Sequence, residues 1–276
     1  MSRKNTPTDR YYQEEYRGKY GPYLGRRSSS REIYETYLPF QQQIITQIKP
    51  YISGDSSVLD VGCSAGHFLT ALKEEVGIRV GIELNPNDIA FIREFLDFTV
   101  YSSPIESAAI AEAPFDLITC LEVLEHIDNP LSFLEGVRKQ LKDTGYFYIE
   151  IPNINDALIT CYDVPEYSDF YYREPHVSYF STETLRLLLT QAGFEGVFKT
   201  IQRYNFLNHL NWILTGKPQE NFLMGNEDPV LVRGKLCAHN LKNTLNTFIR
   251  DVDARYKKIL SENGCGETIT FLGRKR

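Results

Sequence analysis

The sequence predicts an α/β fold in which helices cover both faces of a mainly parallel sheet, a doubly wound architecture. Short apolar runs alternate with amphipathic helical patterns from Ser57 to Ile151. Parallel neighbouring strands need crossover connections, and helices usually supply them. The chain of 276 residues is also long enough to bury a sizeable core. These observations favour one large α/β domain with added segments.

The alternation begins after Pro50. The apolar run at 57–62 predicts a buried strand, and the helical spacing of apolar side chains at 65–76 predicts a helix. Further strands are expected at 79–84, 98–102, 115–122 and 145–151, with helices at 86–95 and 131–141.

The pattern changes after Pro152. A stretch rich in Tyr and Asp continues to Phe180 and is predicted to be a long loop or small insertion. Ser181 is a suitable cap for a helix that Gly193 stops, and a strand is expected at 197–204. We divide the chain into a tyrosine-rich helical lid at 1–50, an α/β core at 51–204, a helical cap or dimerisation insertion at 205–264 and a final strand at 265–276.

Composition excludes several classes of protein. Thirty Lys and Arg against 36 Asp and Glu give a net charge of −6, which argues against bulk binding to nucleic acid or to an anionic membrane. The five cysteines form no CxxC pair and no Cys/His ligand spacing, so zinc and disulfide frameworks are not expected. No apolar run approaches a membrane span. We expect a reduced, cytoplasmic protein, either monomer or homodimer.

Two constellations point to a nucleoside ligand. The first is VLDVGCSAG at 58–66, a strand followed by a glycine-bearing turn that opens a helix. Glycine lets a backbone approach a ligand closely at a helix N-terminus. The second is Glu83 at the end of the next strand, where a carboxylate can accept both hydroxyls of a ribose. The spacing of Gly62 and Gly66 lacks the GxGxxG fingerprint of dinucleotide sites.

A third constellation is acidic. The stretch FDLITCLEVLEHI at 115–127 is a strand with two acids and a histidine at its carboxyl end, and residues 101–130 hold six acids but no Lys or Arg. A negative edge suits a cationic ligand such as a sulfonium. A solvated acidic loop would give the same composition.

In these motifs, the sequence resembles the class I S-adenosylmethionine-dependent methyltransferases, in the branch with a Leu-Glu-His element. The matching stretches are VLDVGCSAG at 58–66, GIEL at 81–84, FDLITCLEVLEHIDNP at 115–130, YFYIEIPN at 146–153 and HVSYFSTETLRLLLTQAGF at 176–194. The resemblance implies a Rossmann-like sheet of seven strands whose last strand is antiparallel. It also implies S-adenosylmethionine as cofactor, S-adenosylhomocysteine as product, and no metal.

Position by position, the resemblance assigns the cofactor site. It implies that Asp60 and the turn of Gly62, Cys63, Ser64 and Gly66 bind the methionine moiety. It implies that Glu83 and Leu84 contact the ribose and the adenine edge. Leu121 and Glu122 would line the sulfonium region. Pro104 stands where the family often has an acid for adenine, so Ile105 is expected to offer its backbone amide instead.

Transfer to an alcohol oxygen needs a base, and histidine is the usual one. His176 and His126 are the candidates, because both are expected at the carboxyl edge of the sheet. His176 is ranked first. The alternative for each is a structural histidine that hydrogen-bonds a loop. Seven of the 18 tyrosines lie in the first 40 residues. Candidate acceptor contacts are Tyr11, Tyr12, Tyr16, Arg26 and Arg27 in the lid, and Tyr171, Tyr172 and Arg173 before His176.

The sequence is compatible with more than one class of methyl acceptor. Residues 203–218 are similar to those of bacterial methyltransferases tied to surface-polysaccharide biosynthesis, which favours O-methylation of a sugar, sugar nucleotide or glycan-linked phosphate group. A small natural product or quinone precursor, methylated on N or O, is the alternative. A sensor that binds the nucleoside without turnover is the alternative from another class, and no nucleic-acid partner is expected.

Overall fold

The computed structural model describes residues 28–173 and 175–276, which form two compact units. Of the described residues, unit 1 contains 28–151, 175–198 and Thr270–Arg276. Unit 2 contains Pro152–Arg173 and Lys199–Ile269. Both units are therefore discontinuous in sequence.

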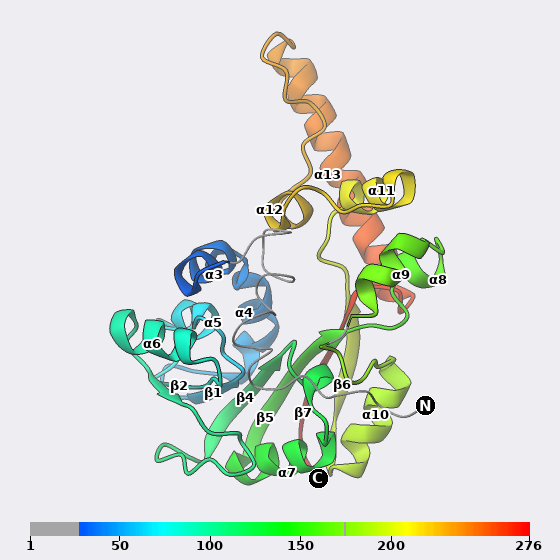
Figure 1. The fold of residues 1–276 in the computed structure, drawn as a ribbon. Helices are drawn as coiled ribbons and strands as arrows, with labels where there is room; N and C mark the ends of the chain where they lie inside the picture. The colour runs from blue at the N-terminus through cyan, green and yellow to red at the C-terminus, as the bar shows by residue number, and fades with distance from the viewer. Residues whose placement is uncertain (1–27, 174) are drawn as a thin grey trace. The chain divides into compact units, whose positions relative to one another are not determined.

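Unit 1 is built on a seven-stranded sheet in the order β3-β2-β1-β4-β5-β7-β6 (Figure 1). The strands are β1 (Ser57–Val61), β2 (Ile78–Ile82), β3 (Thr99–Tyr101), β4 (Phe115–Leu121), β5 (Leu141–Pro152), β6 (Phe194–Ile201) and β7 (Thr268–Lys275). Gly196 of β6 lies against Leu272 of β7, and Gly273 lies against Glu195, so these two strands run in opposite directions. The predicted seven-stranded sheet with one antiparallel strand is confirmed.

The parallel register brings three strand ends to one edge. Ser57 to Val61 pair with Ile78 to Ile82 on one side of β1, and Val58 to Val61 pair with Leu117 to Cys120 on the other. The carboxyl ends of β1, β2 and β4 are therefore level. Residues that follow these strands lie at the edge where doubly wound sheets bind ligands.

Helices cover both faces of this sheet, as Figure 1 shows. Apolar side chains of α4 (Gln42–Ile48), α5 (His67–Ala71) and α6 (Pro86–Phe95) pack with one face in a single buried cluster. On the other face, the ring of Phe147 lies 5.1 Å from Phe194 and 6.4 Å from Phe271. Helices α7 (Pro130–Gln140) and α10 (Thr182–Gln191) complete the unit.

Helix α3 (Ser30–Tyr37) covers the turn after β1. Ser29 and Glu32 form a capping box that starts the helix, and Ile33 packs with Ala65 and Phe91. Ala65 belongs to the glycine-bearing turn, so α3 buttresses that turn from outside. Short 3₁₀ segments, η1 (Leu38–Phe40) and η2 (Lys49–Tyr51), flank α4.

Unit 2 is helical. It contains α8 (Ala157–Thr160), α9 (Pro165–Tyr171), α11 (Phe206–Thr215), α12 (Phe222–Asn226) and the long α13 (His239–Glu262). Leu158, Val164 and Trp212 form its buried apolar cluster. The buried Asn153 amide donates to the carbonyls of Gly264 and Gly266 at 2.9 and 2.7 Å, which joins its two pieces.

Several elements differ from their predicted bounds. The stretch after Pro152 holds two short helices, because the Asp156 carboxylate caps α8 and Pro165 opens α9. The helix expected at 65–76 is regular only over α5, whose N-cap Gly66 has φ of 81° and no side-chain capping bond. The strand expected at 197–204 lies earlier, at β6, and residues 227–238 break the helical insertion.

Among the described residues, no helix combines the length and the apolarity that a bilayer crossing requires.

The aromatic contacts of Phe147 predict a large stability cost on truncation. Phe147→Ala removes a fully buried ring, and we expect the free energy of unfolding to fall by about 3–5 kcal/mol. Urea denaturation followed by circular dichroism measures this change. Ile78→Ala, at a side chain that is 45% exposed, is the control and should cost far less. Equal losses in both variants would contradict this account of the core.

Candidate active site

The turn after β1 is held in a strained backbone geometry. Gly62 and Gly66 have φ of 78° and 81°, and Ser64 has φ of 50°. A Cβ at Gly62 would lie 2.4 Å from Val123 Cγ2, and one at Gly66 would lie 2.7 Å from Leu96 Cδ1. Any larger side chain would therefore clash as well as strain the backbone. Both glycines are required for the turn to pass this close to its neighbours.

Glu83 ties this turn to the end of β2. Its Oε2 accepts the Ser64 N–H at 2.7 Å, and its Oε1 accepts the Leu84 and Asn85 N–H groups at 2.8 Å each. Three main-chain donors thus orient one carboxylate. A carboxylate has about four acceptor positions, so the group retains capacity for a further donor.

Asp60 is a buried carboxyl at the end of β1. It is 2% exposed, and its Oδ1 accepts the Thr119 hydroxyl at 2.6 Å. Burial raises the pKa of Asp60 to about 7; the charge of Glu83 raises it too, and the Thr119 hydrogen bond partly offsets both. This carboxyl therefore changes charge near neutral pH.

The end of β4 lies at the same edge. Glu122 has φ of 56°, and its N–H donates to the Glu150 carbonyl at 2.8 Å. Leu121 is half-buried and Glu122 exposed, while Ile105 is buried and Leu84 is 53% exposed. All ten residues that the sequence assigned to the cofactor lie in unit 1.

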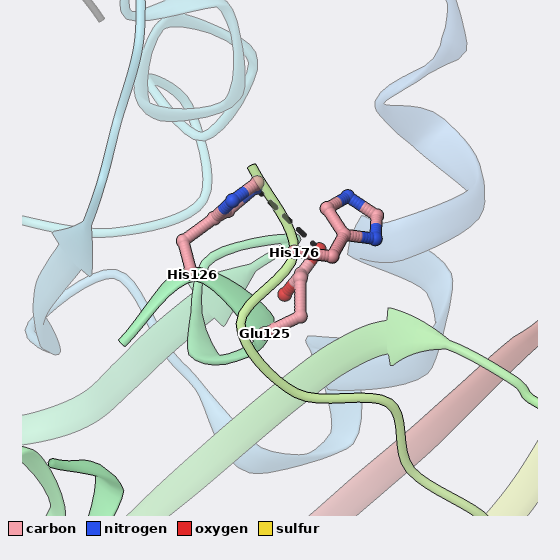
Figure 2. A group of neighbouring side chains, drawn as sticks. All are labelled: Glu125, His126 and His176. Carbon is pink, nitrogen blue, oxygen red and sulfur yellow. Dashed lines mark ion pairs between the residues drawn. The ribbon is translucent and has the colours of Figure 1, made fainter. Parts of the chain in front are cut away.

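Two histidines and a buried acid lie together just beyond β4 (Figure 2). Glu125 and His126 belong to the 3₁₀ turn η3 (Leu124–His126), and His176 follows Pro175 in the second piece of unit 1. The rings of His126 and His176 are 4.9 Å apart and nearly perpendicular. The side-chain donor atoms of all three residues lie within 4.8 Å of one another, a set that could also hold a metal ion.

Main-chain bonds hold this histidine pair in place. The Glu125 carbonyl accepts the N–H groups of Val177 and Ser178 at 2.8 and 3.1 Å. His126 Nδ1 lies 2.9 Å from the Pro175 carbonyl oxygen. A carbonyl can only accept, so this nitrogen carries hydrogen and Nε2 carries the lone pair. Nε2 lies 3.9 Å from Oε1 of Glu125, whose side chain is 2% exposed.

The remaining candidates belong to unit 2 or lie outside the residues that the structure describes. Tyr171, Tyr172 and Arg173 belong to unit 2, where the two tyrosine rings are 5.3 Å apart and Arg173 lies over Phe170 at 5.8 Å. The lid candidates Tyr11, Tyr12, Tyr16, Arg26 and Arg27 lie outside the described residues.

With this geometry established, comparison with known proteins decides the family. Residues 32–198 match a family model described as a methyltransferase domain, which is more than half of the chain. The chain belongs to this methyltransferase family. The methyltransferase recognition that the sequence predicted is confirmed.

Solved structures show the same fold. An S-adenosylmethionine-dependent methyltransferase from Archaeoglobus fulgidus aligns with a TM-score of 0.55 at 20% identity, covering 86% of this chain and 94% of that chain. A putative methyltransferase from Bacillus halodurans aligns with a TM-score of 0.51 at 20% identity, covering 87% of this chain and 99% of its own.

Curated relatives match about a third of the chain. A ubiquinone biosynthesis O-methyltransferase from Histophilus somni is 30% identical over 109 residues, which are 36% of this chain and 46% of the relative. One from Vibrio campbellii is 30% identical over 104 residues, 36% of this chain and 44% of its own length. The chain thus spans less than half of the curated relatives that it matches.

Sequence reasoning missed two groups in this site. Thr119 is a polar residue inside the apolar run of β4, and that exception could have indicated its bond to Asp60. Glu125 was noted only as one acid among several. Its burial beside the histidines depends on contact with residues about fifty positions later, which no local pattern reports.

The raised pKa of Asp60 predicts a pH-dependent stability. In the unfolded chain this carboxyl ionises near its ordinary pKa of 3.8, while in the fold it keeps its proton to about pH 7. The unfolded state therefore binds fewer protons between these values, and folding stability falls as pH rises through that window. A shift of about 3 units corresponds to about 4 kcal/mol at most.

Asp60→Asn removes this titration. Denaturant unfolding at pH 5 and at pH 8 should show a smaller loss of stability in Asp60→Asn than in the wild type. Asp55→Asn, at an exposed position before β1, is the control and should follow the wild type. An identical pH dependence in Asp60→Asn and the wild type would contradict the assignment.

Proposed function

We propose that the chain transfers a methyl group to a hydroxyl oxygen of a small-molecule acceptor, with His126 and His176 removing the proton. The observation that supports this most directly is the histidine pair held beside a buried acid at the ligand-binding edge of a methyltransferase sheet. Methyl transfer is an in-line displacement, so a protein contributes mainly alignment, exclusion of water and, for a hydroxyl, a base.

The residues at the sheet edge fit S-adenosylmethionine. This cofactor supplies a methyl group on a sulfonium and leaves as S-adenosylhomocysteine. The carboxylate of Glu83 can take a ribose hydroxyl in addition to its three main-chain donors, and Asp60 and the turn Gly62–Gly66 would hold the methionine end. Leu84, Ile105, Leu121 and Glu122 would line the adenine and sulfonium regions. This assignment rests on the chemistry of these donors and acceptors.

The geometry favours His126 as the group that accepts the proton. The Pro175 carbonyl fixes its Nδ1 hydrogen, so Nε2 is the basic atom. A positive imidazolium formed there would lie close to Glu125, whose buried carboxyl would stabilise the charge if ionised. His176, ranked first from sequence, packs edge-on against this ring and stays a candidate for the same role.

The curated relatives favour an aromatic hydroxyl as acceptor. Their names describe O-methylation in ubiquinone biosynthesis, and quinone precursors carry hydroxyls on a ring. A phenolic hydroxyl has a pKa of about 10, as in tyrosine, so histidine deprotonates it far more readily than an alcohol. We therefore place a quinone-type phenol ahead of the sugar hydroxyl that the sequence suggested, with Tyr171, Tyr172 and Arg173 as candidate acceptor contacts.

Two sets of acceptor compounds test whether the chain methylates phenols rather than sugars. Purified protein, S-adenosylmethionine and either catechols or sugar nucleotides are assayed for S-adenosylhomocysteine and for the methylated product. Turnover of catechols with methyl on oxygen supports the proposal. Turnover confined to sugar nucleotides, or methylation on nitrogen, would contradict it.

Cofactor affinity should depend on Glu83. Glu83→Gln loses a charged acceptor, and we expect the Kd for S-adenosylmethionine to rise about 10- to 100-fold. Isothermal titration calorimetry with S-adenosylmethionine and S-adenosylhomocysteine measures it. Glu94→Gln, an exposed acid on α6, is the matched control. Unchanged affinity in folded Glu83→Gln would remove Glu83 from the cofactor site.

Activity should depend on the histidine pair through proton removal. We expect His126→Gln to lower kcat/KM about 10²- to 10⁴-fold and to abolish the fall in rate on the acid side of the pH profile, with cofactor affinity unchanged. His176→Gln tests the second histidine in the same way, and His239→Gln, exposed on α13, is the control. Full activity of both His126→Gln and His176→Gln would contradict the proposal. Loss of wild-type activity in EDTA would instead indicate a metal on this cluster.

A further inference from the structure

Unit 2 contains a segment that is ordered yet almost entirely uncovered. Residues 230–250, which we call the arm, comprise a loop and the first half of α13. Ile249 is the one buried residue among them. Figure 1 shows the loop running back beside the helix.

Hydrogen bonds from Asn246 hold the loop of the arm on the helix. The Asn246 Oδ1 accepts the N–H groups of Leu231 and Val232 at 3.0 and 2.8 Å, and its Nδ2 donates to the Val232 carbonyl at 3.1 Å. One side chain on α13 thus fixes two loop residues. The arm is a built element that presents its side chains in a set arrangement.

The arm displays apolar side chains to solvent. Leu236 is 103% exposed, Phe248 59% and Leu241 53%. Leu241, Leu245 and Phe248 are spaced by four and three residues, which places them on one face of α13. Val230 and Leu231 add two exposed apolar residues from the loop.

Its charge is opposite to that of the rest of the chain. The arm contains Arg233, Lys235, Lys242 and Arg250 and no Asp or Glu. The whole chain carries 30 basic and 36 acidic residues, so the remainder has 26 against 36, a net charge of −10. The net charge of −6 disfavours adsorption of the molecule as a whole, but the arm alone is positive.

We propose that the arm docks on the surface of an anionic lipid bilayer. Exposed leucine and phenylalanine side chains interleaved with Lys and Arg are the features of segments that lie in a membrane interface. The apolar residues would enter the headgroup boundary, and Arg233, Lys235 and Lys242 would meet lipid phosphates or carboxylates. This inference concerns a surface outside the proposed acceptor chemistry and does not depend on it.

The chemistry of the arm argues against two other partners, a second copy of the chain and a nucleic acid. Pairing of two arms about a two-fold axis would bring identical patches together, with basic residues on both sides and no acid on either. A nucleic acid would satisfy the cations but leave Leu236 and Phe248 without an apolar environment. A bilayer satisfies both features at once.

Vesicle sedimentation of the full chain tests the proposal. Vesicles of phosphatidylcholine alone are compared with vesicles containing 30 mol% phosphatidylserine (about one lipid in three, to give a strongly negative surface), at low and high salt. We expect binding to the anionic vesicles only, weakened by salt. Arg233→Gln/Lys235→Gln/Lys242→Gln should lower the partition coefficient about 100-fold, since each cation contributes roughly fivefold. Leu236→Ser/Phe248→Ser should lower it strongly as well.

Matched controls and a direct readout accompany these variants. Leu187→Ser and Lys139→Gln change exposed residues of unit 1 and should bind as the wild type does. Leu236→Trp places a fluorophore on the arm, whose emission should shift to the blue with anionic vesicles, whereas Leu187→Trp should not shift.

Three outcomes would overturn the proposal. One is absence of vesicle binding, with no shift for folded Leu236→Trp. Another is a wild-type dimer in light scattering that Leu236→Ser/Phe248→Ser dissociates without any vesicle binding, which would assign the arm to a second copy. The third is tighter binding to an RNA or DNA oligonucleotide than to vesicles, lost in the arginine and lysine variant.

Discussion

The hydrogen bonds of the Glu83 carboxylate are the interaction on which the turn after β1 depends. It gathers main-chain N–H groups from the turn after β1 and from the start of the segment after β2. These two segments follow neighbouring parallel strands, so the carboxylate fixes the strained turn in its position relative to β2. The glycines make that turn possible, and the carboxylate selects it from the conformations that glycine permits. The ligand-binding edge is thus organised before any ligand arrives.

The end of β4 is organised by contacts between segments about fifty residues apart in the sequence. The turn η3 receives the segment 175–178 through the Glu125 carbonyl and through the ring of His126. The turn after β1 and Glu83 come from the first piece of unit 1, while His176 comes from the piece that follows Arg173. The two sides of this sheet edge can therefore be altered by separate changes in the sequence.

Local patterns predicted the sheet and its order of elements because each strand is an apolar run and each crossover helix an amphipathic one. The family resemblance assigned Asp60, Glu83 and the glycine turn to one site, and they lie at one edge because the carboxyl ends of β1 and β2 are level. Local patterns did not predict α8 and α9, whose cues are single residues, Asp156 and Pro165, rather than a period. Nor could they predict the burial of Glu125, since a carboxylate in a loop is normally solvated and only the return of residues 175–178 covers it.

The position of β7 in the sheet has a consequence for how the molecule is made. β7 lies between β5 and β6, although it is the last strand in the chain. During synthesis, β6 therefore emerges with no neighbour to pair with, and it must wait until the whole of residues 202–267 has followed. The sheet of unit 1 closes only after translation has passed α13. Until that moment the edge of β5 that β7 will occupy has no paired strand and is open to other strands.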